Sequence, residues 1–283
     1  MRLQALPFEL LKVGHCTHPE CMATRGGRWQ SVMFPALCGL ILHPTRGYIL
    51  FDTGYSQHFM TATQPFPERL YRWTTPVNLP HEEQLLTQLA VRGIRPADIS
   101  HIFISHMHAD HIAGLRDFPK ARFIVSRAEY DQARRMSRLG GLLHAFLPAL
   151  LPDDIADRLD FVEDAPVRKL PPELTMFDSG FDLFNDGSIL ALPLPGHSRG
   201  QMGVIFKRAD HKLVFMAADA CWSRQALLEN KWPTIFANRI FDHVGNYRRS
   251  FALLRQAAAH PEPALILPSH CEQSWKELSN DIK

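Results

Sequence analysis

The stretch His106-Met107-His108-Ala109-Asp110-His111 places four side chains that can bind a metal ion within six residues. A cluster this dense is improbable by chance, even in a chain with 15 histidines. His106 and His108 are two positions apart, so at the end of a strand their side chains point to the same side. Asp110 and His111 follow where the chain is predicted to turn into a short helix over residues 112–115. Because one tetrahedral ion needs only three protein ligands and water, the stretch indicates two adjacent ions.

Elsewhere in the chain, short apolar runs stop at polar residues that can bind or support a metal. Such runs are typical of buried strands, and the residues after them lie where strands give way to loops. Apolar residues recur at helical spacing over residues 82–90 and 248–259, which lie between these runs. The sequence therefore predicts a layered α/β fold with central sheets. The runs are 47–51 before Asp52, 102–104 before His106, 189–192 before His197, 213–218 before Asp219 and 264–269 before His270.

The composition is that of an ordinary globular chain, with 283 residues, 46% hydrophobic, 21% charged and a net charge of +2. This balance predicts no strong attraction to nucleic acid or to a membrane surface. No stretch of about 18 uncharged apolar residues occurs, and the N-terminus lacks the pattern of a signal peptide. An odd number of widely spread cysteines predicts reduced thiols in the cytoplasm: Cys16, Cys21, Cys38, Cys221 and Cys271.

The stretch 106–111 resembles the signature of the metallo-β-lactamase-fold hydrolases, and the strand-end residues follow in that family's order. The resemblance spans roughly residues 35 to 271. It implies an αββα four-layer sandwich, in which two central β-sheets are flanked by helices and metals bind at one edge. We expect residues 1–283 to form one such domain, with insertions near 55–80 and 128–170 that shape the substrate pocket.

The resemblance also implies a ligand set for two ions: His106, His108 and His197 for one, Asp110, His111 and His270 for the other, and Asp219 between them. Nitrogen and carboxylate ligands without a thiolate suit zinc, and manganese or iron(II) could also bind. Asp52 is expected to accept an imidazole N–H and so fix a ring. Two ions would make a bridging hydroxide available at neutral pH, with Asp110 passing a proton to the leaving group.

The neighbours of these residues bear on the substrate. Residues 195–201 resemble the corresponding loop of acyl-homoserine lactonases and hydroxyacylglutathione hydrolases, with Gln201 in place of a second histidine. Lactonases commonly have a tyrosine three residues after the bridging aspartate, where this chain has Trp222. The main hypothesis is a hydrolase of a lactone or other carboxylic ester with an apolar or aromatic part. Alternatives are a hydrolase of small phosphodiesters or thioesters, and a non-catalytic ligand-sensing protein.

The expected partner is therefore a small molecule, and the near-neutral charge argues against nucleic acid. A homodimer is a further expectation from the resemblance. Residues 142–151 are either a packed helix broken at Pro148 or an insertion that lines the pocket, and residues 55–80 are predicted to form a structured loop near the site. The grouping His15, Cys16, His18 and Cys21 is either a small metal site or a loop with reduced thiols, and its spacing favours the loop.

Overall fold

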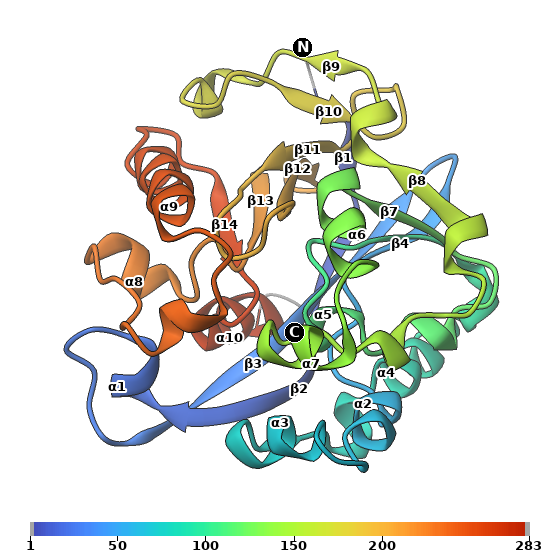
Figure 1. The fold of residues 1–283 in the computed structure, drawn as a ribbon. Helices are drawn as coiled ribbons and strands as arrows, with labels where there is room; N and C mark the ends of the chain where they lie inside the picture. Colours follow the sequence, from blue (N-terminus) through green and yellow to red (C-terminus); the bar gives the residue numbers. More distant parts are fainter. Residues whose placement is uncertain (1–2, 281–283) are drawn as a thin grey trace.

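Two mixed β-sheets form the centre of the computed structural model, which describes residues 3–280 (Figure 1). In the first sheet, β2, β3 and β4 pair antiparallel, and β6, β7 and β8 continue in parallel from β4. Its strand order is β5-β2-β3-β4-β6-β7-β8. The strands are β2 (Phe8–Pro19), β3 (Ser31–His43), β4 (Gly47–Phe51), β5 (Val77–Asn78), β6 (Ile99–Phe103), β7 (Arg122–Val125) and β8 (Leu159–Phe161).

The second sheet has the order β14-β13-β12-β11-β10-β9, with β1 beside β12. Strands β9 to β13 pair antiparallel, whereas β13 and β14 run parallel. The strands are β1 (Ala5–Leu6), β9 (Val167–Arg168), β10 (Gly180–Asp182), β11 (Leu190–Pro193), β12 (Met202–Arg208), β13 (Leu213–Ala218) and β14 (Leu265–Pro268).

Alternating side chains divide the core into three buried clusters. Val214 and Met216 of β13 face the first sheet, whereas Phe215 points to the opposite face, as the two-residue period of a strand requires. Helices α8 (Arg224–Leu228) and α9 (Val244–Ala258) cover that outer face. Helices α2 (Gln57–Ala62), α4 (Leu85–Val91) and α5 (Ala109–Ile112) cover the outer face of the first sheet. The predicted four-layer αββα sandwich is confirmed.

Several boundaries differ from the prediction. The helix after His108 is α5, which begins at Ala109 rather than at residue 112, because Asp110 is favourable in a first turn and Gly114 disfavours continuation. Residues 55–80 hold two short helices, α2 and α3 (Arg69–Thr74), rather than a loop. Helix α10 (Glu272–Asn280), which the sequence analysis missed, packs Leu278 into the core between the sheets.

The segment after β7 contains α6 (Arg127–Ala133) and α7 (Arg138–Leu143). Residues 142–151 do not form one helix, since the helical turn that follows α7 spans only Pro148–Leu150. The packed helix broken at Pro148 is therefore not found, and Phe146 of this segment is buried and lines a cavity. Over residues 3–280, none of the helices has the length and apolar character that crossing a membrane requires.

Candidate metal centre

The predicted site residues meet at one edge of the two sheets because the strands before them point the same way. Strands β4 and β6 are parallel neighbours in the first sheet, and β11, β13 and β14 share a direction in the second. The carboxyl ends of aligned strands open onto one edge, where ligands bind in many α/β folds. Two loops at this edge carry candidate ligands: the His106 loop (residues 104–108) between β6 and α5, and the His197 loop (residues 194–201) between β11 and β12.

All seven residues predicted as metal ligands are brought together. Their donor atoms form three overlapping groups, and within each group the atoms lie within 4.8 Å of one another. The groups are His106, His108 and His197; His106, His111 and Asp219; and Asp110, His111 and His270. The first and third coincide with the two predicted sets, and the second places Asp219 between them.

Several donor atoms of this cluster are buried and lack a hydrogen-bond partner. They include Nε2 of His106, Nε2 of His111 and Oδ1 of Asp219. Leaving a buried polar atom unpaired costs about 1–3 kcal/mol, so such atoms are rare unless something binds them. Metal ions bound at this cluster would satisfy all three, and the nitrogen and carboxylate donor set fits zinc.

Neighbouring groups fix the orientation of these rings. His111 donates Nδ1–H to Oδ2 of Asp52 over 2.8 Å, and His270 donates Nδ1–H to the carbonyl of Pro35 over 2.7 Å. Both contacts leave Nε2 directed at the cluster, the arrangement that metal-binding histidines commonly use. Asp52 also accepts the backbone N–H of Ser105 over 2.8 Å, which places it as the sequence predicts.

Burial keeps the histidines of one group neutral. Desolvation, helped by the neighbouring histidines, holds the pKa of His106 well below its usual range. Desolvation also lowers the pKa of His108 and of His197 to about 3, although Asp219 acts in the opposite direction. These three rings are therefore uncharged at neutral pH and can offer a lone pair to a metal.

On the other side of the cluster, nearby charged groups outweigh the effect of burial on the pKa values. Burial alone would lower the pKa of His111, but the carboxylates of Asp110, Asp52 and Asp219 raise it to about 10. Burial alone would raise the pKa of Asp219, but His270 and the other neighbouring histidines hold it well below its usual range. Without a metal, the centre thus holds a proton on His111 beside the ionised carboxylate of Asp219.

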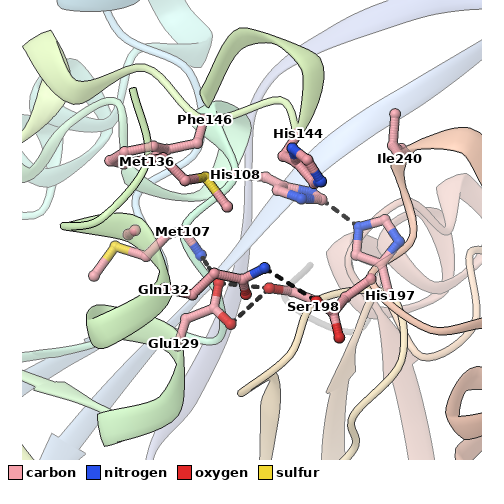
Figure 2. A pocket seen from close by; sticks show the side chains of 12 residues that line it. Met107, His108, Glu129, Gln132, Met136, His144, Phe146, His197, Ser198 and Ile240 are labelled. Carbon is pink, nitrogen blue, oxygen red and sulfur yellow. Dashed lines mark hydrogen bonds between the residues drawn. The ribbon is translucent and has the colours of Figure 1, made fainter. Parts of the chain in front are cut away.

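A small cavity opens beside His108 and His197 (Figure 2). Its apolar walls come from Met107, Met136, Phe146 and Ile240. On another side of the cluster, Trp222 donates its indole N–H to Oδ2 of Asp219 over 3.2 Å and packs edge-on against His197. Gln201 is buried and donates to the Leu194 carbonyl within its own loop.

A carboxylate behind the centre was not predicted from the sequence. Glu129 lies on α6. Burial raises the pKa of its carboxyl group, and hydrogen bonds from Ser198, Met107 and Gly200 offset only part of this rise. The available signal was Ser126 followed three residues later by Glu129, a pattern typical of a helix start.

The grouping of His15, Cys16, His18 and Cys21 does not form a further metal site. It lies along β2 and the short helix α1 (Glu20–Ala23), and within residues 3–280 these four side chains do not come together as ligands. His15 instead lies 3.6 Å from the Glu83 carboxylate. All five cysteines, which fall within the described residues, are free.

Known proteins are similar to this chain in sequence and in fold. The N-acyl homoserine lactonase AttM of Agrobacterium fabrum is 26% identical over 236 residues, which cover 83% of this chain and 81% of that protein. An N-acyl homoserine lactone hydrolase, solved with N-hexanoyl-L-homoserine at its catalytic metal centre, has a TM-score of 0.69 at 20% identity and 98% and 97% coverage. The dizinc quorum-quenching lactonase AidC has a TM-score of 0.67 at 18% identity, with 96% and 90% coverage.

A sequence model of the metallo-beta-lactamase superfamily matches residues 33–270, from the first sheet to the last candidate ligand, His270. That span contains each of the strand ends at which the candidate ligands meet. With the four-layer fold and the histidine and aspartate cluster at its edge, the match leads to one conclusion: the chain belongs to the metallo-β-lactamase superfamily.

Proposed function

We propose that this protein is a dinuclear metal-dependent hydrolase that opens lactones, with N-acyl homoserine lactones as the first class to test. The observation that carries the proposal is the convergence of seven donor residues, several with unpaired buried atoms, at one edge of the fold. The lactonase relatives support the substrate class.

Zinc is the metal we infer for both positions. His106, His108 and His197 would hold one ion, Asp110, His111 and His270 the other, and Asp219 would contact both. A dizinc relative of the same fold and a donor set without thiolate support this choice. When bound, such ions acidify a water and polarise the carbonyl of an ester.

Asp110 is the residue we assign to proton transfer. Its side chain is 13% exposed, more than that of any other ligand candidate, and its Oδ2 lies 3.5 Å from Nε2 of His270. A carboxylate at this rim can contact both the cluster and an entering substrate. It would accept a proton during attack on the ester and return it to the leaving alkoxide.

The walls around the centre favour a substrate with an apolar part. Met136, Phe146 and Ile240 line the small cavity beside His108 and His197, and an apolar group of the substrate would contact these side chains. Trp222 presents an N–H donor but no ionisable hydroxyl, so it can support Asp219 but cannot supply an acidic proton. We infer that proton transfer therefore depends on Asp110 more than it would in a site with a tyrosine at this position.

The test is a substrate panel assayed with metal-stripped protein that has been reloaded with zinc, manganese or iron(II). The panel contains acyl-homoserine lactones of increasing chain length, aryl esters, thioesters and bis-aryl phosphates. We expect ring opening of the lactones, detected as the addition of one water by mass spectrometry, and none in the stripped protein. The proposal would be contradicted by a preference for thioesters or phosphodiesters. It would also be contradicted if protein with two ions bound hydrolysed none of the substrates.

We further infer that the chain is a single domain working on a small molecule in a reducing compartment. Its three buried clusters lie between successive layers of one sandwich, and its cysteines are unpaired. Limited proteolysis would test the single domain, and cell fractionation would test the compartment.

A further inference from the structure

One buried carboxylate links the two loops that carry three of the candidate ligands. Glu129 is 3% exposed, and its Oε1 accepts the backbone N–H of Met107 over 2.9 Å. Its Oε2 accepts the backbone N–H of Gly200 over 2.9 Å, and the Ser198 hydroxyl lies 2.6 Å from both oxygens (Figure 2). The carboxylate is therefore supplied with three donors from two separate segments.

These donors lie next to candidate metal ligands. Met107 stands between His106 and His108 in the His106 loop, and Ser198 directly follows His197 in the His197 loop. The His106 loop follows a strand of the first sheet, and the His197 loop follows a strand of the second. Glu129 thus connects the two sheets at the place where their loops supply one group of three histidines.

The start of α6 is built to bring Glu129 to these loops. Ser126 accepts the backbone N–H of Glu129 over 3.1 Å as the helix cap, and its hydroxyl donates to the Gly200 carbonyl over 2.7 Å. A Cβ on Gly200 would lie 2.1 Å from Oγ of Ser126 and 2.4 Å from the nitrogen of Glu129, so only glycine fits.

The Glu129 side chain does not close a capping box with Ser126. In a capping box, the glutamate at this position turns back to the backbone N–H of the capping residue. Here both oxygens of Glu129 accept from the two loops instead. Burying a carboxylate is costly unless several donors satisfy it. That compensation is complete only when both loops are in place.

We propose that Glu129 is a positioning residue that sets the distance between the His106 loop and the His197 loop, and so shapes the three-histidine half of the metal centre. The inference rests on the proposed metal centre. The other half uses Asp110 and His111 on α5 and His270 after β14. Asp52 orients the His111 ring, and the Pro35 carbonyl orients the His270 ring. Loss of Glu129 should therefore weaken one ion and spare the other.

The test is zinc binding to E129Q, measured by competition with a chelating dye. The amide is nearly the same size, but its NH2 group must face the backbone N–H of either Met107 or Gly200, so one of these two links is lost. We expect one of the two zinc ions to bind about 10- to 100-fold more weakly, the usual effect of removing a group that supports metal ligands. The second ion should keep the wild-type affinity.

A double-mutant cycle identifies which ion is affected. H197A alone should lose the ion of the three-histidine half, and E129Q added to H197A should then change the remaining affinity little. H270A alone should weaken the other ion, and E129Q added to H270A should leave neither ion tightly bound. This pattern of coupling follows only if Glu129 and His197 act on the same ion.

D182N is the matched control, because Asp182 is equally buried and accepts the Gly187 N–H, on strand β10 of the second sheet rather than in either loop. It should lower the unfolding temperature without changing the affinity ratio of the two ions. Folded E129Q that binds both ions as the wild type does, or weakens both equally, would overturn the inference.

If E129Q does not fold, S198A removes a single donor to the same carboxylate. It should weaken the same ion by a smaller factor, and no change in S198A would then overturn the inference. A wild-type protein that binds no zinc would instead disprove the proposed metal centre, a result separate from any effect of Glu129.

Discussion

The two halves of the metal centre are built differently. The half of His106, His108 and His197 is all imidazole and fully buried, and burial keeps its rings neutral. The half of Asp110, His111 and His270 contains carboxylate, lies closer to solvent, and holds a proton on His111 when no metal is bound. From this difference we propose that the first half would serve as a fixed anchor and the second would exchange protons with substrate and water.

Loss of a ligand from either half should have the largest effect. H106A or H270A should lower kcat/KM for lactones by about a thousandfold or more, because each ion contributes several kcal/mol to the transition state. H81A is the control, since His81 is exposed on a 3-10 turn. Near-wild-type rates in H106A would mean that the three-histidine half is not used in catalysis.

Asp110 separates metal binding from proton transfer. D110N should keep at least the ion of the three-histidine half but lower kcat by about 100- to 10,000-fold, because an amide cannot accept the proton. Zinc content and steady-state kinetics measured on the same sample check this prediction. Normal turnover in zinc-loaded D110N would remove the proton role from Asp110.

Asp52 should act on the half that Glu129 does not support. D52N removes the carboxylate that accepts Nδ1–H of His111, so the ion held by Asp110, His111 and His270 should bind about 10- to 100-fold more weakly. Chelator competition would show this loss, and D52N combined with E129Q should weaken both ions. If D52N weakened the same ion as E129Q, the division into two independently supported halves would be wrong.

A pH dependence is expected only in the second half. The raised pKa of His111, about 10, means that an entering ion must displace a proton at neutral pH. Zinc affinity should therefore rise about tenfold per pH unit between roughly pH 7 and 9. Conversely, the stability that the His111 proton gives the metal-free protein is complete below about pH 6.5 and is lost as the pH rises through 10.

Calorimetry in buffers of different ionisation enthalpy would measure the proton released. H197A should keep this pH dependence for its remaining ion, because the pKa of His197 is already about 3 and its loss removes no bound proton. A zinc affinity that did not change with pH would show that His111 is neutral in the metal-free protein.

Local patterns, together with the family resemblance that they carry, were enough to predict much of this site. The short-range signals were the stretch 106–111 and the apolar runs before Asp52, Asp219 and His270. In the structure these runs are strands, and the residues after them meet at one edge of the sheets. Contacts between distant segments could not be found in this way. Glu129 meets Ser198 across 69 residues, and His270 meets Pro35 across 235. Their roles depend on the packing of the sheets, which no local pattern encodes.

The donor residues are spread from His106 to His270 and come from both sheets. The centre can therefore assemble only after nearly the whole sandwich has formed, which makes it a late product of folding. Ions that bind this edge but not the unfolded chain stabilise the native protein by mass action. Metal supply in the cell would then set the lifetime of the protein as well as its activity, because the metal-free protein would unfold and be degraded more readily.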